Sequence, residues 1–384
     1  MESGRARRAR RVGPAPGEAP LSAGMPSGEI GIDLILLLLP FRQVLVRPYP
    51  PLKISAWLPL ALALVLTACG DILGSKEGEG AFDPASLIPS QDSLFHHVEA
   101  LAHDSMRGRG SGSVDELRAA QYLKERLQAY GLQAPDSGMI QEFSAVSRRD
   151  RTPLSSRNVL AALPGSGRLA DQWIVVGAHY DHIGYRDLPD ESQGPNNGAD
   201  DNASGTAMVL EMARVFSLAT KRGGRAPAPR RSILFAFWGA EEEGLLGSCH
   251  YVFEEPKVPL GKTGALMNFD MVGRLRGDTL VVWGGETSQV WDVLVPDANL
   301  SRLEVLLPRP SPPRSTDHAC FWQVGIPWVW FFTRLHPEYH TPFDVVELIN
   351  FPGMVRIGEL AMRVLAELAV MAEAPDFSGP IPNR

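Results

Sequence analysis

Apolar residues recur every three or four positions in several segments, as expected of helices that bury one face. The segments with this pattern are residues 87–103, 114–130, 208–216 and 352–372. Asp92 or Ser93 can cap the first of these helices. In the second, Leu117 is expected on the buried face, and Gly131 provides a stop signal.

Other short segments are continuously apolar, which is typical of strands covered on both faces. These segments are residues 174–178, 232–238, 265–269, 280–283 and 328–332, and further strands are expected at 139–146 and 158–163. Because such strands alternate with helical patterns, the chain is predicted to have an α/β fold with a mostly parallel central sheet sandwiched by helices.

The N-terminal part of the chain has a different pattern. Arginines crowd into residues 5–11 of a Pro-, Gly- and Ala-rich segment without apolar period, which is typical of a disordered or removed segment. Apolar stretches at 30–40 and 54–68 are both too short for an uninterrupted membrane-spanning helix. The second follows Lys53, ends in small residues and has the parts of a secretory signal.

That apolar stretch ends in Leu66-Thr67-Ala68-Cys69-Gly70, which resembles a bacterial lipobox. The resemblance implies cleavage before Cys69 and lipidation of its thiol, and a buried cysteine beside a hydrophobic anchor is the alternative. We therefore expect an exported bacterial lipoprotein held by Cys69 at the periplasmic or cell-surface face of a membrane. The long extension before Lys53 suggests that translation starts further downstream.

These patterns divide the chain into four parts. They are an N-terminal extension with a lipoprotein signal peptide (1–69), a tether (70–88), a folded domain (89–374) and a C-terminal tail (375–384). A hydrophobic fraction of 44% in 384 residues supports a substantial core. The net charge of -7 shows no basic surplus, so nucleic acid is not expected as a partner.

Lipidation of Cys69 leaves only Cys249 and Cys320. Two thiols are too few for a disulfide scaffold or a thiolate metal site. In an oxidising periplasm they could pair, although no spacing rule decides whether they do.

Imidazole and carboxylate side chains follow several of the predicted strands or lie in glycine-flanked turns near them. The set consists of His179, Asp201, Glu241, Glu242, Asp270 and His340. In α/β sheets, sites form where strand ends meet helix N-termini, so these side chains are expected to converge. Histidines together with carboxylates suit zinc or a similar divalent ion, whereas calcium prefers oxygen ligands alone.

A pair of ions about 3.5 to 4 Å apart can share one carboxylate and one water, lower the pKa of that water to about 7 and polarise a carbonyl group. One further carboxylate must stay off the metals to accept a proton from the water. The adjacent residues Glu241 and Glu242 can divide these two roles, because neighbouring side chains at a strand end point in different directions.

Five segments occur in a specific order along residues 90–372. They are Gly177-Ala178-His179-Tyr180-Asp181, the acidic loop 198–205, Ala240-Glu241-Glu242-Glu243-Gly244 with the following four residues, Asn268-Phe269-Asp270-Met271, and Tyr339-His340-Thr341-Pro342. Together they resemble the M28 family of co-catalytic zinc aminopeptidases. The resemblance implies a zinc-exopeptidase fold of the phosphorylase/hydrolase-like type and two zinc ions per chain.

The resemblance also implies roles for individual residues. His179 and Asp270 would bind one zinc, Glu242 and His340 the other, Asp201 would bridge both, and Glu241 would be the general base. Asp181 would hydrogen-bond the His179 imidazole and fix its tautomer. Tyr339 would steady the oxyanion of the reaction, with a core aromatic as the alternative, and the Asp201-Asn202 peptide bond would be cis.

The remaining histidines and two acidic neighbours are assigned structural roles. His318 lies in a segment that shapes the pocket of the family and is not expected to bind metal. The other histidines are interpreted as surface or core residues, and Asp200 and Glu243 as hydrogen-bonded or solvated neighbours; the histidines concerned are His96, His97, His182, His250 and His336.

The leading hypothesis is a metal-dependent exopeptidase that hydrolyses the N-terminal bond of peptides with a free N-terminus. A glutaminyl cyclase with a single zinc, which forms N-terminal pyroglutamate, is the first alternative. A carboxypeptidase acting on acidic C-termini usually has additional domains that this chain lacks. A non-catalytic peptide-binding module would have lost metal ligands, whereas all the expected ligands are present here.

Overall fold

The computed structural model describes residues 87–382, except for 186–193, 222–229 and 313. The expected N-terminal extension, signal peptide, Cys69 and nearly all of the tether lie outside the described residues. None of the helices in the described ranges combines enough length with enough apolar character to span a bilayer.

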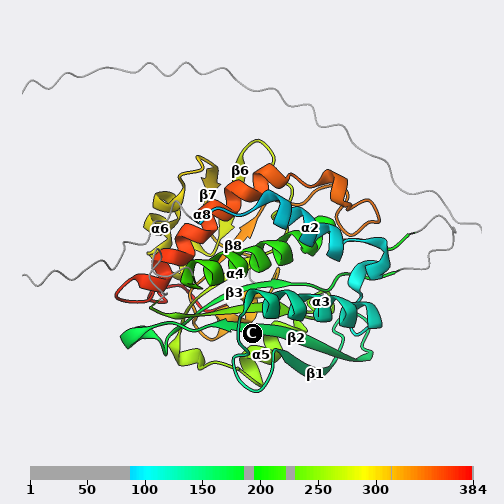
Figure 1. The fold of residues 1–384 in the computed structure, drawn as a ribbon, viewed down its shortest axis with the longest axis horizontal. Helices are drawn as coiled ribbons and strands as arrows, with labels where there is room; N and C mark the ends of the chain where they lie inside the picture. The colour runs from blue at the N-terminus through cyan, green and yellow to red at the C-terminus, as the bar shows by residue number, and fades with distance from the viewer. Residues whose placement is uncertain (1–86, 186–193, 222–229, 313, 383–384) are drawn as a thin grey trace, which may run out of the picture. The chain divides into compact units, whose positions relative to one another are not determined.

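An eight-stranded sheet forms the centre of the domain, in the order β1-β2-β4-β3-β5-β8-β6-β7 (Figure 1). The strands are β1 (Ile140–Val146), β2 (Pro153–Leu163), β3 (Trp173–His179), β4 (Ser232–Trp238), β5 (Thr263–Phe269), β6 (Thr279–Trp283), β7 (Glu304–Leu306) and β8 (Trp328–Phe332). The four central strands β4, β3, β5 and β8 are parallel, whereas β1, β2 and β6 each pair antiparallel with a neighbour. The predicted α/β fold with a mostly parallel sheet is therefore confirmed, with antiparallel pairs toward both edges.

Helices cover both faces of this sheet. One face carries α2 (Gln91–Leu101), α3 (Val114–Tyr130), α4 (Gly205–Lys221), α6 (Trp291–Ala298) and α8 (Phe351–Val370), and the other carries α5 (Leu246–Phe253) and α7 (His318–Gln323). Figure 1 shows α4 between α2 and the sheet, with α8 alongside. The sheet is thus enclosed, which explains why its central strands contain almost no polar residues.

Alternation of side chains along β3 links the two layers of the core. Ile174 and Val176 belong to the cluster under α4 and α8, while Val175 packs on the side of α5 and α7. All three side chains are fully buried, and each stabilises the fold by about 1.5–3 kcal/mol through removal of apolar surface from water. The strand is therefore fixed on both faces, which holds its C-terminal residue in place.

Two details of the predicted helices are wrong. Ser90 is the N-cap of α2, since its hydroxyl accepts the Ser93 N–H at 3.2 Å, so neither Asp92 nor Ser93 has that role. Leu117 is 48% exposed because the buried face of α3 is formed by Glu116, Ala120, Leu123 and Leu127, and Leu117 points away from it. The predicted stop of α3 is confirmed, since Gly131 adopts a left-handed conformation with φ 78°.

The C-terminal tail and a disulfide add to the layer of α5 and α7. Trp322 Nε1 donates a hydrogen bond to the Pro380 carbonyl at 2.7 Å, so the tail packs along the domain. Cys249 and Cys320 form a disulfide that joins α5 to α7.

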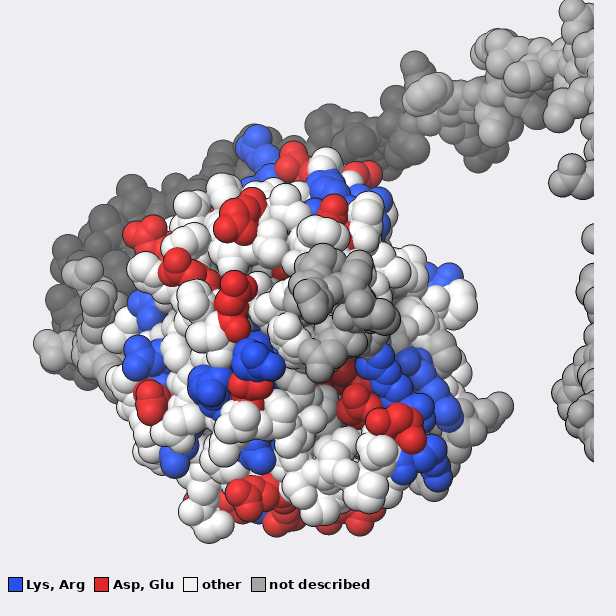
Figure 2. All heavy atoms as spheres, turned by 90° about the vertical axis from the view of Figure 1, so that its right-hand side faces the viewer, with Lys and Arg blue, Asp and Glu red and all other residues white. Residues whose placement is uncertain are grey.

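Figure 2 shows the side of the molecule that lies at the right of Figure 1. Acidic and basic side chains are intermixed over that side.

Candidate metal centre

The carboxyl ends of three parallel strands meet at one edge of the sheet and supply most of the candidate ligands. His179 is the last residue of β3, Asp270 directly follows β5, and Glu241 and Glu242 follow β4 by three and four residues. Because β3 lies between β4 and β5, these side chains converge. The arrangement expected from the strand pattern is therefore present in the fold.

A first cluster of possible metal ligands contains His179, Glu241 and Asp270, whose ligand atoms all lie within 4.8 Å of one another. His179 Nε2 is 3.5 Å from Asp270 Oδ1 and 3.3 Å from Asp201 Oδ1. Both His179 and Asp270 are buried. An imidazole and two carboxylates thus face a common point.

A second cluster contains His182, Asp201, Glu242 and His340, again within 4.8 Å of one another. His340 Nε2 is 3.0 Å from Asp201 Oδ2 and 3.2 Å from Glu242 Oε1. His340 comes from the loop before α8 and has a φ of 56°, so a distant part of the chain completes this cluster.

Asp201 connects the two clusters through its two carboxylate oxygens. Oδ1 faces His179 at 3.3 Å, and Oδ2 faces His340 at 3.0 Å. A carboxylate shared in this way is the arrangement needed to bridge two metal ions. The fold therefore brings together all five predicted ligands, and the peptide bond that follows Asp201 is cis, as the family resemblance implied.

The residues of both clusters fit divalent metal ions. Asp201 Oδ2 and His340 Nε2 are buried and, despite their short separation, neither has a hydrogen-bond partner among the described residues. A cation between two such atoms would satisfy both, whereas their burial without one is costly. Imidazole nitrogens with carboxylate oxygens are ligands that suit zinc.

The electrostatics of the cluster residues depend on one another. Burial alone would lower the pKa of His340, but the adjacent Asp201 and Glu242 raise it to about 10. Burial would raise the pKa of Asp201, but the neighbouring His182, His179 and His340 hold it well below its ordinary value. In the metal-free protein the imidazole of His340 therefore carries a proton that a bound cation must displace.

The pKa of Glu241 is raised well above its ordinary value. Burial is the main cause, and the carboxylates of Asp317, Glu242 and Asp270 add to it, against the opposing effect of His179. A carboxylate that readily accepts a proton at neutral pH has the property required of a general base.

Asp181 does not make the contact expected of it. Its carboxylate Oδ1 is 3.8 Å from His179 Nδ1, too far for a hydrogen bond, and the Asp181 backbone carbonyl lies closer to that nitrogen, at 3.2 Å. The carboxylate instead accepts the backbone N–H groups of Glu241 and Glu242 at 3.0 and 3.3 Å and the Ser111 hydroxyl at 2.7 Å. Asp181 therefore positions the pair of glutamates rather than the imidazole.

Arg109 is a structural residue of the site that the sequence patterns did not indicate. Its fully buried guanidinium donates to the backbone carbonyls of Leu101, Tyr180, Asn197 and Gly198 at 2.6 to 3.0 Å. It thereby joins the end of α2, the exit of β3 and the loop that leads to the bridging carboxylate. No residue spacing could reveal this role, because all four partners are main-chain atoms.

Asp344 is a second such residue. Its carboxylate accepts the backbone N–H groups of Asp200 and Asp201 at 2.9 to 3.1 Å. Burial, together with the charge of Asp200, raises the pKa of Asp344 to about 6. The sequence signal for Asp344 is its position two residues after the Tyr339-His340-Thr341-Pro342 motif.

The other residues considered from the sequence have varied positions. Tyr339 stacks on His340 with ring centroids 3.8 Å apart. His318 lies outside both clusters and stacks on Trp328, and Asp200 is a buried neighbour that accepts the Gly273 N–H at 2.6 Å. The remaining residues make contacts away from both clusters. His97 forms hydrogen bonds with two tyrosines, His250 stacks on Phe143 and His336 contacts Asp200. Glu243 accepts a hydrogen bond from the Ser147 hydroxyl, and His96 is exposed.

His182 is the exception among these histidines. It was interpreted as an ordinary surface or core residue, and it is fully buried, but the structure places it within the second cluster. Its position directly after Asp181, three residues beyond the His179 strand end, is the sequence signal that could have indicated this.

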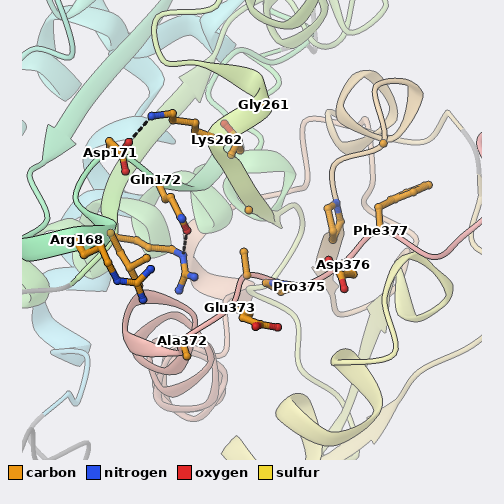
Figure 3. Close-up of a pocket in the computed structure, with 17 residues that line it drawn as sticks. Arg168, Asp171, Gln172, Gly261, Lys262, Ala372, Glu373, Pro375, Asp376 and Phe377 are labelled. Carbon is orange, nitrogen blue, oxygen red and sulfur yellow. Dashed lines mark hydrogen bonds and ion pairs between the residues drawn. The ribbon is translucent and has the colours of Figure 1, made fainter.

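A cavity of about 750 Å³ lies at the opposite edge of the sheet (Figure 3). It is lined by residues that precede the central strands, including Gln172 before β3, Arg231 before β4 and Lys262 before β5. Figure 3 shows Lys262 in contact with Asp171, and Arg231 Nε donates to Gln172 Oε1 at 2.9 Å, so these polar groups are already paired. The cavity is therefore separate from the metal centre, because it lies at the ends of the strands opposite to those that supply the ligands.

Residues 158–365 match the model of peptidase family M28, which is more than half of the chain. The chain belongs to peptidase family M28. It is 29% identical over 237 residues to aminopeptidase YwaD of Bacillus subtilis, covering 58% of this chain and 47% of that protein. It is 28% identical over 312 residues to leucine aminopeptidase 1 of Coccidioides posadasii, covering 74% of this chain and 76% of that one.

Solved structures share the M28 fold. BSAP, a zinc aminopeptidase from Bacillus subtilis, has a TM-score of 0.60 at 20% identity, with 77% of this chain and 100% of that chain covered. Legionella LapA has a TM-score of 0.58 at 23% identity, covering 75% and 76%. The chain spans about half the length of the first curated relatives that it matches, at 47% and 56% of their lengths.

Proposed function

We propose that this M28 protein is an exopeptidase that uses two zinc ions to hydrolyse the N-terminal bond of peptides with a free N-terminus. The observation that carries the proposal is the bridging geometry of Asp201, whose two oxygens face His179 and His340 at 3.3 and 3.0 Å. His179 and Asp270 would hold one ion, and Glu242 and His340 the other. A single-zinc cyclase would leave one of these two complete ligand sets without a role.

Zinc bound at this centre would supply Lewis-acid chemistry, activating a water and polarising the scissile carbonyl. Glu241 would take the proton from the attacking water and pass it to the leaving amine, a transfer typically worth about 10² to 10⁴ in rate. Asp181 would keep Glu241 and Glu242 in place through its hydrogen bonds to their backbone N–H groups. Tyr339, stacked on His340, would donate its hydroxyl to the developing oxyanion.

The names of the relatives support the choice of substrate, since both curated relatives described above are aminopeptidases. The acidic character of the site supports the same choice, because Glu241 and the neighbouring acidic groups would attract the ammonium group of a free N-terminus. Peptides with a free N-terminus are therefore the substrates to test first.

We also propose that the protein is exported and anchored by a lipid at Cys69. The Cys249–Cys320 disulfide supports export, because disulfides persist in oxidising compartments outside the cytoplasm. Replacement of Cys69 by Ser should release the protein from the membrane fraction of the producing cell. Unchanged membrane association of Cys69→Ser would refute the lipid anchor.

The activity is tested with the full-length protein, loaded with zinc and given peptides with free, N-acetylated and N-terminal glutamine ends. Mass spectrometry should show stepwise loss of N-terminal residues from the free peptides only. Glu241→Gln should reduce the rate by about 10² to 10⁴, whereas the control Glu125→Gln, on the exposed face of α3, should leave it unchanged. Loss of ammonia from the glutamine peptides alone would identify a cyclase instead.

A further inference from the structure

His182 is fully buried within the second cluster but has no part in the ligand set assigned above. We propose that His182 is a fourth protein ligand of this metal position, which would then bind zinc through His182, Asp201, Glu242 and His340. The inference rests on the proposed two-metal centre but not on any particular substrate.

The distances within the cluster support direct ligation. His182 Nδ1 is 2.9 Å from Glu242 Oε1 and 3.5 Å from Asp201 Oδ2. His340 Nε2 is 3.2 and 3.0 Å from the same two oxygens. Zinc bonds of about 2.0–2.2 Å in a tetrahedral arrangement separate the ligand atoms by about 3.3–3.5 Å. The four separations of 2.9–3.5 Å are at or somewhat below that value, and all the ligand atoms of the cluster lie within 4.8 Å of one another, so small shifts would bring all four atoms to one ion.

A hydrogen bond from His182 to Glu242 is the competing explanation. It accounts for the contact at 2.9 Å, but not for the approach of the same nitrogen to Asp201 Oδ2. The two imidazoles face the same pair of oxygens, with ring centroids 5.5 Å apart and an interplanar angle of 70°. Two rings that converge on two shared oxygens are arranged around a point, as ligands are around an ion.

The fold holds the His182 ring in this position. The backbone N–H of His182 donates a hydrogen bond to the Arg109 carbonyl at 3.2 Å, which fixes the backbone beyond β3. On its other side, the ring packs against Gly198, where a Cβ would come within 2.6 Å of the ring. Gly198 has a φ of 55°, so both its conformation and the ring require a glycine there. The imidazole is therefore pre-organised and does not depend on an exposed rotamer.

A fourth ligand makes the two metal positions unequal. Zinc sites with four protein ligands are typically structural, whereas catalytic sites have three and leave one position open. The position of His179, Asp201 and Asp270 would keep an open coordination site, while the position of His182 would be closed. We therefore expect the second position to bind zinc more tightly and to fill first.

The test counts imidazoles on the bound metal. In the metal-depleted full-length protein loaded with two equivalents of zinc, X-ray absorption should detect about 1.5 imidazoles per zinc, from His179, His182 and His340 on two ions. His182→Asn retains an N–H near the Nδ1 position but is a poor zinc ligand, and it should lower the number to about 1.0. The control His96→Gln changes an exposed histidine and should leave it unchanged.

Zinc titration by calorimetry gives a second readout. His182→Asn should weaken the tighter site by more than about 100-fold, beyond the 10- to 100-fold typical for residues that only hydrogen-bond a ligand. A value of about 1.0 imidazole per zinc in the wild type with two bound ions would overturn the inference about His182 and leave the two-metal function intact. This outcome needs only the wild type, so it can be read even if His182→Asn does not fold. A single bound zinc with two imidazoles, one of them lost in His182→Asn, would instead retain the ligand and refute the two-metal function.

Discussion

Glu116 makes the stability of the domain depend on pH in a way that can be measured. Its buried carboxylate is in α3, where Oε2 accepts the Gly112 N–H at 2.8 Å and the Ser156 hydroxyl donates to Oε1. Burial is the main cause that raises its pKa from 4.5 to about 8, and the charge of Asp181 adds to it. The neutral acid is therefore the form that the folded protein prefers.

The sign and size follow from the difference between the folded and unfolded states. Because the folded pKa lies above the unfolded one, the contribution of Glu116 to the free energy of unfolding is largest below pH 4.5 and falls until about pH 8. At about 1.36 kcal/mol per pKa unit, the full loss is about 5 kcal/mol, which is a large part of the stability of a typical domain.

Urea unfolding of the metal-free protein and of Glu116→Gln, at intervals from pH 5 to 9, measures this contribution. Relative to the wild type, Glu116→Gln should gain several kcal/mol between pH 5 and pH 9, because an amide cannot ionise. Glu125→Gln, on the exposed face of the same helix, should follow the wild type. Parallel curves for the wild type and Glu116→Gln would show that Glu116 is already ionised in the fold at pH 5 and would refute the reasoning.

Three further predictions concern the site and the core. Zinc affinity should rise with pH toward about 10, because the folded pKa of His340 is near that value and its proton must leave; calorimetry that finds no change between pH 6 and 9 would contradict this. Arg109→Met should lower the free energy of unfolding by at least about 3 kcal/mol, since three buried carbonyls and one part-buried carbonyl lose their donor, and a urea midpoint within error of the wild type would refute it. Leu123→Ala should cost about 2–5 kcal/mol and Leu117→Ala below about 1 kcal/mol, because Leu123 is fully buried and Leu117 is half-exposed; equal costs in thermal unfolding would count against this assignment of the core.

The elements that the sequence predicted best are those with strong local signals. Strand β4 and strand β8 have the predicted bounds, because a short apolar run that is buried on both faces has a single interpretation in this context. Strand β7 was missed, since it has only three residues at the sheet edge and none is fully buried. Antiparallel pairing of β2 and β6 was also not foreseen, because pairing direction depends on chain connections rather than on side-chain pattern.

The same distinction applies to the metal centre. The five expected ligands were identifiable because each follows a strand or lies in a motif with a specific residue order. Two of the three hydrogen bonds that the Asp181 carboxylate accepts come, in contrast, from main-chain N–H groups, and such partners leave no trace in residue identity. The place of His182 in the second cluster was not predicted, because a histidine after a strand has the same sequence appearance whether it packs in the core alone or beside candidate ligands.

The position of Arg109 has a consequence for where the working unit of this protein begins. The family match starts at residue 158, yet Arg109 and Ser111 both precede it and contact the exit of β3. A fragment with the boundaries of the family match would retain every proposed zinc ligand and still lack the residues that anchor their loops. A fragment that keeps these anchors therefore extends upstream to include α2 and α3, and because Leu87 is buried in the core, boundaries for truncation or fusion should be chosen before residue 87.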